Sequence, residues 1–201
     1  MAIRATIRMA READARAILA IYAPFCVTTA VSFELEPPSE DEIASRIRAV
    51  TAYWPWLVLE DDGAVAGYAY ASRHSERAAY GWSVDVTVYV APSHLRRGVG
   101  RALYTTLFEL LRQQGFFKAY AGVALPNPAS TALHEAIGFE PVGVYKGVGY
   151  KLGAWRDVAH YQLALQPERP APDSPVPAAS LLHSPAWSEA VSRGLSHYRT
   201  P

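Results

Sequence analysis

The chain has 201 residues, half of them hydrophobic, and its 19 lysines and arginines equal its 19 aspartates and glutamates. That length is enough for one sizeable core and too short to require two domains. The balanced charge argues against nucleic acid or an anionic membrane surface as a partner of the whole molecule, so any anion site must be local.

Cysteine content and hydropathy bear on the compartment. The single cysteine, Cys26, excludes an internal disulfide and a thiolate metal cluster, and it fits a reducing environment. The sequence has no apolar run long enough to span a bilayer and no leader with a cleavage site near Met1. We therefore expect a soluble cytoplasmic protein without a metal, in which Cys26 is a small buried apolar residue.

Hydrophobic spacing and turn residues divide the first 90 residues into strands and helices. Ser39 and Glu42 are spaced as a capping box and open a helix, and Asp61-Asp62-Gly63 is a hairpin signal between two strands that should pair antiparallel. The predicted elements are a strand over residues 2–9, a helix over 14–25, a helix beginning at 39, strands over 56–59 and 65–72, and the longest strand over 82–90.

The second half continues with two helices and three strands. Gly115 and Gly138 each end a helix, while Asn127 followed by Pro128 suits a helix start. The predicted elements are a helix over residues 98–114, a strand over 118–123, a helix from 127 to 138, and strands over 142–152 and 158–165. If the helix over residues 98–114 forms a right-handed crossover, the strand over 118–123 runs parallel to the strand over 82–90.

The composition changes after Gln166, where prolines recur among alanines and serines. This pattern predicts an extended tail over residues 167–201, following a domain over residues 1–166. Trp187, Val191 and Leu195 are spaced four apart, so a short amphipathic helix that docks on the body or on a partner is the alternative to a disordered tail.

The stretch HLRRGVGRALYTTLFELLRQQG, residues 94–115, places glycines and arginines where a strand gives way to a helix. Such a turn presents free backbone N–H groups and the positive end of a helix dipole, which suits phosphate oxygens. A P-loop is excluded because its glycine spacing and its Gly-Lys-Ser/Thr ending are missing, and Leu103 stands where a dinucleotide fold needs a small residue. A glycine turn with solvated arginines remains the alternative.

Two segments, in order, carry a family resemblance. RGVGRA, residues 97–102, matches the Gln/Arg-x-x-Gly-x-Gly/Ala loop of the GNAT N-acetyltransferase superfamily, and LPNPASTALHEAIGF, residues 125–139, resembles its second cofactor segment. Together with PWLVLEDDGAVAGYAYAS, AAYGWSVDVTVYV and GYKLGAWRDV, these segments are similar to the phosphinothricin and methionine sulfoximine N-acetyltransferases, from Ile7 to about Leu165. The resemblance implies an α/β (α+β) single domain with a mixed, mostly antiparallel sheet of six to seven strands, about four helices and a splayed central strand.

The implied reaction is acetyl transfer from acetyl-CoA, in a ternary complex, to the α-amino group of a small amino acid. An ammonium is not a nucleophile, so a base must take its proton. Asp85 stands where the family carries a glutamate, and its shorter reach favours a water relay. His134 stands where many relatives carry a tyrosine, and its chemistry allows proton donation to the thiolate or partnership with Asp85. An ion pair for Asp85 and core packing for His134 are the structural alternatives.

The resemblance also assigns the cofactor and acceptor sites. A bulge in the long strand is expected to turn its amides toward the thioester and the pantetheine arm, with N–H groups as oxyanion donors. The implied cofactor residues are Val88, Tyr89, Val90, Arg96, Arg97, Gly98, Val99, Gly100, Arg101, Asn127 and Ser130. The implied acceptor residues are Phe33, Tyr70, Arg77 and Tyr80, an arginine for a carboxylate or phosphinate and aromatic walls. Ser75 replaces a basic residue of the herbicide-modifying members, which favours methionine-like acceptors.

Two other activities and an assembly state complete the predictions. A protein N-terminus or a polyamine as acceptor would require an open acidic groove, whereas residues 73–80 are basic and aromatic. A non-catalytic acyl-CoA-binding module would not need both Asp85 and His134. By analogy with the family we expect a homodimer, with tryptophans such as Trp155 or Trp187 at the interface.

Overall fold

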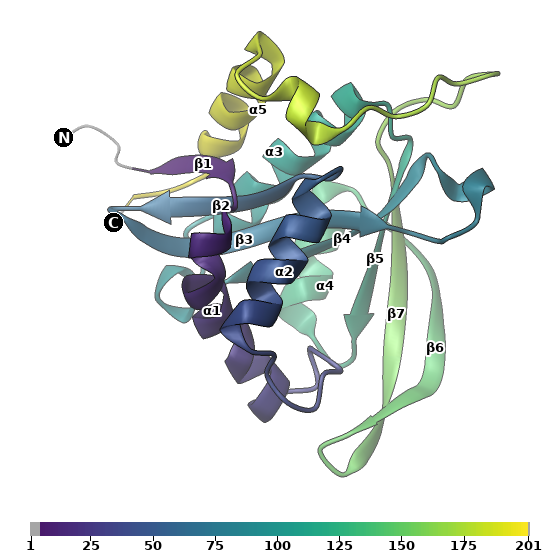
Figure 1. The fold of residues 1–201 in the computed structure, drawn as a ribbon. Coiled ribbons are helices and arrows are strands. Elements are labelled where there is room, and N and C mark those ends of the chain that lie inside the picture. The colour runs from purple at the N-terminus through teal and green to yellow at the C-terminus, as the bar shows by residue number, and fades with distance from the viewer. Residues whose placement is uncertain (1–4, 201) are drawn as a thin grey trace.

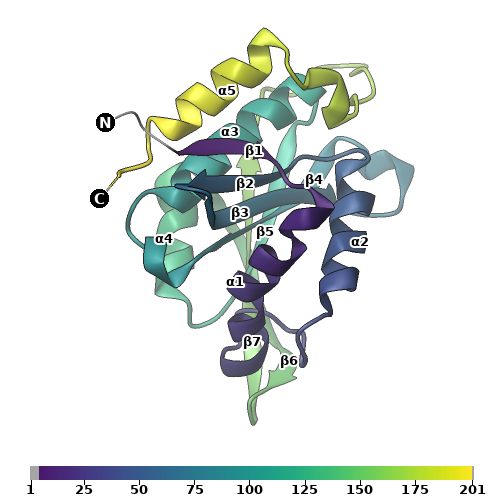
Figure 2. The ribbon, with the colours of Figure 1, turned by 60° about the vertical axis from the view of Figure 1, so that its left-hand side comes forward.

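The computed structural model describes residues 5–200, which form one seven-stranded sheet with helices on both faces (Figures 1 and 2). The strands are β1 (Thr6–Met9), β2 (Trp56–Asp61), β3 (Ala64–Arg73), β4 (Ser83–Val90), β5 (Lys118–Ala124), β6 (Glu140–Lys151) and β7 (Ala154–Ala164). The helices are α1 (Ala15–Thr28), α2 (Glu40–Thr51), α3 (Val99–Gln114), α4 (Pro128–Ile137) and α5 (Pro185–Leu195). The mixed α/β fold is confirmed, with a fifth helix beyond the four expected.

The strand order is β1-β2-β3-β4-β5-β7-β6, and every neighbouring pair is antiparallel except β4 with β5. Helices α1 and α2 cover one face, where Ile18 and Ile47 pack against Trp56 and Tyr68. Helices α3, α4 and α5 cover the other face. Of the predicted strand over residues 2–9, residues 2–4 lie outside the described part of the chain, and β1 covers Thr6–Met9.

Most helices begin and end at the capping residues that the sequence indicated. Ser39 accepts the N–H of Glu42 at 3.1 Å, and Asn127 accepts that of Ser130 at 3.1 Å. The reciprocal half of the expected capping box is absent, because the Glu42 carboxylate pairs with Arg46 instead. Helix α1 runs three residues past the predicted end at Phe25 and includes Pro24, whose missing N–H costs one hydrogen bond.

The two middle strands separate. β4 and β5 share three residue pairs, Ser83 with Lys118, Val84 with Ala119 and Asp85 with Tyr120, and then diverge. The β3–β4 register is unbroken from Gly67 opposite Val90 to Arg73 opposite Val84. The expected splay is therefore present, but it comes from divergence of β4 and β5 and not from a bulge in the β3–β4 pairing.

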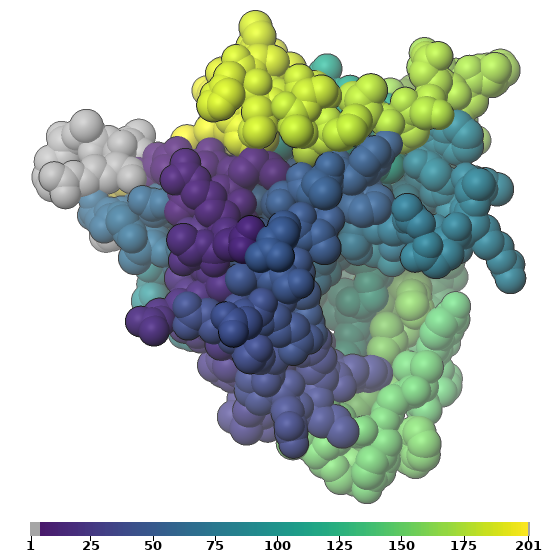
Figure 3. All heavy atoms as spheres, viewed as in Figure 1, coloured from purple at the N-terminus to yellow at the C-terminus, as the bar shows by residue number. Residues whose placement is uncertain are grey.

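Residues of the expected tail pack against the body. The 11 residues of α5 lie along α3 (Figure 2), and Figure 3 shows this C-terminal part of the chain covering the top of the molecule. Trp187, Val191 and Leu195 pack against the main core. The helices touch so closely at Gly194 that a Cβ there would lie 2.0 Å from the Thr106 hydroxyl. Of the alternatives left open by the sequence, docking on the body is the one found.

Candidate active site

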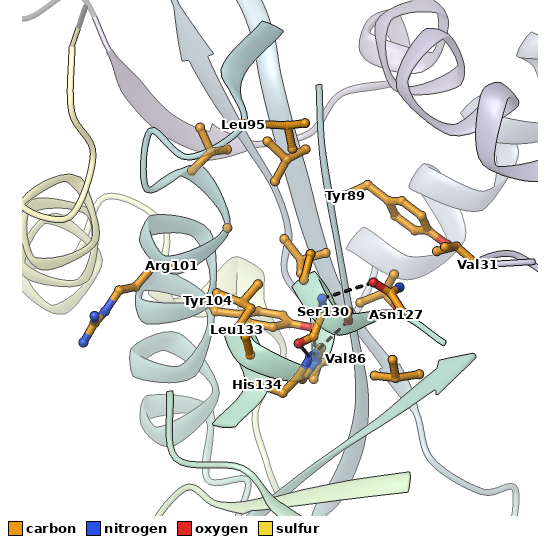
Figure 4. Close-up of a pocket in the computed structure, with 18 of the residues that line it drawn as sticks. Val31, Val86, Tyr89, Leu95, Arg101, Tyr104, Asn127, Ser130, Leu133 and His134 are labelled. Carbon is orange, nitrogen blue, oxygen red and sulfur yellow. Dashed lines mark hydrogen bonds between the residues drawn. The ribbon is translucent and has the colours of Figure 1, made fainter. Parts of the chain in front are cut away.

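A cavity of about 710 Å³ opens where β4 and β5 part, between α1, α3 and α4. It is lined by most of the predicted cofactor residues, namely Val88, Tyr89, Val90, Arg96, Gly98, Val99, Gly100, Arg101, Asn127 and Ser130, and by His134. Figure 4 shows Tyr89 and Val31 on one side of the cavity, Tyr104 and Leu133 on the other, and Asn127, Ser130 and His134 together. The two motif segments thus meet around one space.

One end of the cavity is built for an anion. Arg96 and Gly98 adopt left-handed backbone angles, with φ of 61° and 82°, and α3 begins immediately after them. The first N–H groups of a helix have no intrahelical acceptor, and the dipole there favours negative charge. Arg96 and Arg101 are exposed beside this end, and Figure 4 shows the Arg101 side chain directed outward from α3. These features fit the pyrophosphate of a coenzyme.

Arg97 is the one predicted cofactor residue that does not line the cavity. Its guanidinium donates to Asp61 at 2.9 Å and lies over the ring of Tyr198, 5.1 Å from the centroid. The Tyr198 hydroxyl donates to the same Asp61 oxygen at 2.6 Å, and the N–H of Arg199 donates to the Arg97 carbonyl at 2.9 Å. The C-terminal segment around Tyr198 and Arg199 therefore supports the glycine turn on the side away from the cavity.

β4 forms the wall of the cavity between its two ends. Beyond Asp85 it pairs with β3 on one edge only, so its backbone groups on the other edge face the cavity. The Tyr89 ring packs against Tyr22 and Phe25 of α1, with centroids 5.2 and 5.1 Å away. Tyr89 is thus both cavity lining and packing between the sheet and α1.

His134 is buried on the α3 side of the sheet, and both ring nitrogens have partners. Nδ1 lies 2.8 Å from the Ser130 carbonyl, which only accepts, so Nδ1 carries the proton. Nε2 lies 3.2 Å from the Tyr104 hydroxyl, which then donates to it. Burial lowers the pKa of His134, although the Ser130 carbonyl opposes the shift. The arrangement holds a neutral imidazole backed by a buried tyrosine that also lines the cavity.

Asp85 lies on the other face of the sheet, since its neighbours Val84 and Val86 point into the α3 core. Its carboxylate is 2.7 Å from Nδ1 of His74, and no hydrogen bond or ring contact joins it to His134. Burial raises the pKa of Asp85, and the His74 hydrogen bond opposes this rise. Sequence reasoning missed His74 because an isolated histidine in a charged loop carries no periodicity or motif.

Two smaller hollows lie on the face of the sheet that carries Asp85, the first next to the cavity and the second next to the first. The first, about 420 Å³, shares Tyr89 and Gly122 with the cavity and includes Phe33. The second, about 290 Å³, includes Tyr70 and Arg46, whose guanidinium is already paired with Glu34 at 2.6 Å. Figure 3 shows a recess on this face between α2 and the β6–β7 hairpin.

Of the four predicted acceptor residues, Phe33 and Tyr70 each line one of these hollows, and Arg77 and Tyr80 line neither. Phe33 packs so closely on Gly149 of β6 that a Cβ there would lie 2.3 Å from its ring. Tyr70 stacks on Trp56 at 4.3 Å, and Tyr80 meets the ring of His74 at 5.5 Å. Arg77 lies on the exposed loop, and within residues 5–200 its side chain makes no hydrogen bond or ion pair. The structure brings Tyr80 next to the His74 ring of the Asp85–His74 pair, and it does not bring Arg77 into the cavity or the hollows.

The described residues also bear on a metal site and on a membrane-spanning helix. Residues 5–200 contain no group of three or more His, Cys, Asp or Glu side chains placed to hold a metal ion. In the same part of the chain, every helix is too short or too polar to cross a membrane. Cys26 is buried and unpaired by any disulfide.

Comparison with known proteins gives a consistent result. The chain is 41% identical over 170 residues to phosphinothricin N-acetyltransferase of Streptomyces viridochromogenes, covering 85% of this chain and 92% of that one. It is 34% identical over 171 residues to an L-methionine sulfoximine/L-methionine sulfone acetyltransferase of Salmonella typhimurium, covering 84% and 99%. A GNAT superfamily phosphinothricin acetyltransferase from Sinorhizobium meliloti, solved with acetyl-CoA, superimposes with a TM-score of 0.81 at 37% identity, covering 87% and 96%.

A family model agrees with these relatives. Residues 7–159 match the acetyltransferase (GNAT) domain, which spans β1 to the middle of β7 and includes the cavity and both motif segments. On this match and on the cavity geometry, the chain belongs to the GNAT acetyltransferase family.

Proposed function

We propose that the protein transfers the acetyl group of acetyl-CoA to the α-amino group of a small amino acid such as L-phosphinothricin, methionine sulfoximine or methionine sulfone. The observation that carries the proposal is the cavity at the β4–β5 parting, which joins an anion-binding helix start to the Asp85 face of the sheet. The names of relatives at 34–41% identity support the acceptor class. The domain of residues 1–166 would carry the reaction, with residues 167–201 as its C-terminal extension.

The residues suit acetyl-CoA at both ends of the cavity. The α3 start, with Gly98, Gly100, Arg96 and Arg101, would bind the pyrophosphate through N–H groups and charge. Free N–H groups of β4 would orient the pantetheine arm and polarise the carbonyl that is attacked, a contribution of roughly 3 kcal/mol in other acyl-transfer sites. Bound acetyl-CoA supplies an activated thioester.

The remaining chemistry concerns protons. The acceptor nitrogen must lose a proton before it attacks. The Asp85 side chain is half exposed, and we assign it to the set of residues that removes this proton. His134 is neutral and fully hydrogen-bonded, so we assign it to holding the Tyr104 hydroxyl at the cavity wall. Phe33, Tyr70, Arg77 and Tyr80 would form the acceptor site between them.

The proposal is tested by measuring CoA release with acetyl-CoA and a panel of acceptors: phosphinothricin, methionine sulfoximine, methionine sulfone, a polyamine and an N-terminal peptide. We expect turnover of one of the first three and its collapse in Asp85→Asn at neutral pH, with partial recovery at high pH, where the free amine needs no base. Turnover of the peptide or polyamine alone would replace the acceptor. Tight acetyl-CoA binding without any turnover would favour a non-catalytic acyl-CoA-binding protein.

Assembly and location follow the same analogy. We propose a homodimer, supported by the edge strand β6, which exposes Val144, Tyr145, Val148 and Tyr150, and by the exposed Trp155 of β7. Trp187 packs against the core, which leaves it little part in an interface. Light scattering at micromolar concentration would give twice the 22.0 kDa chain mass if the proposal holds, and the chain mass if it fails. A cytoplasmic location and a contribution to herbicide resistance belong to the proposal too.

A further inference from the structure

The site contains a histidine that the family resemblance does not assign. His74 follows the end of β3, and its Nδ1 lies 2.7 Å from the Asp85 carboxylate. Its ring stacks on Tyr120 of β5, with centroids 4.4 Å apart and planes 21° apart, and meets Tyr80 edge-on at 5.5 Å. The ring is thus held on two sides by aromatic residues and at one nitrogen by a carboxylate.

This contact decides which ring nitrogen is free. An ionised carboxylate only accepts hydrogen bonds, so Nδ1 carries the proton and Nε2 of the neutral ring holds the lone pair. Among residues 5–200, Nε2 of His74 has no hydrogen-bond partner, and the side chain is 28% exposed. A basic nitrogen therefore stands open at the site.

The position of the pair relative to the cavity is set by the strand. Thr87, which lines the cavity, is two residues after Asp85 on the same face of β4, roughly 7 Å along the strand. Asp85 is one methylene shorter than the glutamate that the resemblance implies. The His74 imidazole, hydrogen-bonded to its carboxylate, adds a second basic group at this position.

Other titratable groups face the pair from each neighbouring strand. His160 of β7 interacts electrostatically with Asp85 without a hydrogen bond to it, and its Nε2 is buried with no partner in the described part of the chain. Tyr70 of β3 interacts electrostatically with Asp85, and the rings of Tyr120 and Tyr80 contact the His74 ring. Within residues 5–200, only His74 is hydrogen-bonded to the Asp85 carboxylate, which distinguishes it from His160.

We propose that His74 is the general base of this enzyme and that Asp85 is the positioning residue that fixes its tautomer. Nε2 takes one proton from the acceptor ammonium, which frees the nitrogen lone pair for attack on the thioester carbonyl. As the C–N bond forms and the C–S bond breaks, the nitrogen loses its second proton, and the departing thiolate takes up one proton to leave as the CoA thiol. His74 then returns its proton to solvent. The inference rests on the proposed amino-acid acetylation and names its base.

The test separates a base from a positioning group. In His74→Asn the amide N–H replaces Nδ1–H toward Asp85 but supplies no basic nitrogen, whereas His74→Phe keeps only the ring. If His74 is the base, both variants lose about 100-fold or more in kcat and the acidic limb of the pH profile, with acetyl-CoA affinity unchanged. The matched control His160→Asn keeps both. A near-normal rate in His74→Asn overturns the proposal, because Asp85 alone would then suffice as base.

A second measurement does not depend on the acceptor. Nitrogen-15 NMR of the ring reports which nitrogen of His74 carries the proton, and we expect Nδ1–H in the unmodified protein, with a shift toward Nε2–H in Asp85→Asn. An Nε2–H ring in the unmodified protein overturns the inference. If no acceptor turns over, the proposed function fails, and the NMR result still decides whether the pair exists as inferred.

Discussion

Two glycines with the same backbone angle provide a controlled test of how the C-terminal segment holds the cofactor turn. Gly98 and Gly63 both have a φ of 82°, where an L side chain costs roughly 1–2 kcal/mol. A Cβ at Gly63 would meet nothing within 4 Å, but a Cβ at Gly98 would lie 2.0 Å from the carbonyl oxygen of His197. That oxygen belongs to backbone, so either the turn or the segment must move.

The two substitutions to alanine should therefore differ in cost. Gly63→Ala carries only the backbone penalty, about 1–2 kcal/mol. Gly98→Ala adds overpacking of a further ~1–3 kcal/mol and displaces the Arg97–Asp61–Tyr198 contacts beside it. Because those contacts hold the turn, Gly98→Ala should also weaken acetyl-CoA binding, whereas Gly63→Ala should not.

Urea unfolding followed by tryptophan fluorescence gives the stability difference, and titration calorimetry gives the dissociation constant for acetyl-CoA. The refuting result is equal destabilisation in the two variants with equal affinity, which would mean that the segment does not press on the turn in solution.

Three further predictions concern other groups. Lys151→Met should lower the free energy of unfolding by about 1–3 kcal/mol, because the buried Nζ donates to the carbonyls of Ser32 and Glu34. Since these two residues line the 420 Å³ hollow, the change should also raise KM for the amino acid but not for acetyl-CoA, which steady-state kinetics with each substrate varied would show. His134 has a lowered pKa when folded, so the unfolded chain binds its proton first and stability should fall as the pH drops below about 6.5; urea midpoints from pH 8 to 5 should lose this decline in His134→Gln. Arg97→Ala should leave the salt dependence of acetyl-CoA binding unchanged in calorimetry, since its charge faces Asp61 and not the cavity.

The sequence was informative where a local signal determines local structure. Gly115 and Gly138 end helices with φ of 100° and 104°, and Asn127 caps α4, because each of these residue types satisfies a backbone requirement by itself. The Val, Thr and Tyr residues of 82–90 and the helical spacing after Gly98 were enough to predict β4 and α3 and, with a right-handed crossover, the parallel pairing of β4 with β5. These features need no knowledge of distant residues. The expectation that the strand over 82–90 is the longest was wrong, because β6 has 12 residues and β4 has 8.

What could not be predicted depends on residues far apart in the chain. Arg97 turns away from the cavity because Asp61 and Tyr198 converge behind it, from positions 36 residues before and 101 residues after it in the sequence. The spacing of Trp187 and Val191 suggested an amphipathic helix, but its docking surface exists only once α3 is folded. His74 meets Asp85 only because β3 pairs with β4, so no local sequence pattern could predict this contact.

The parting of β4 and β5 has a mechanical consequence. In the described part of the chain, a unit made of β1–β4 and a unit made of β5–β7 are joined by the three β4–β5 residue pairs and, just before β4 begins, by the Phe117 N–H, which donates to the Trp82 carbonyl at 2.9 Å. A short pairing of this kind opens more easily than a full strand pairing, so the amides of Val84 and Tyr120, which face it, should exchange with deuterium sooner than those of the β2–β3 pairing. A ligand in the cavity contacts both units and links them across the short β4–β5 pairing, so the sheet should open less often as a larger fraction of the protein is bound to ligand.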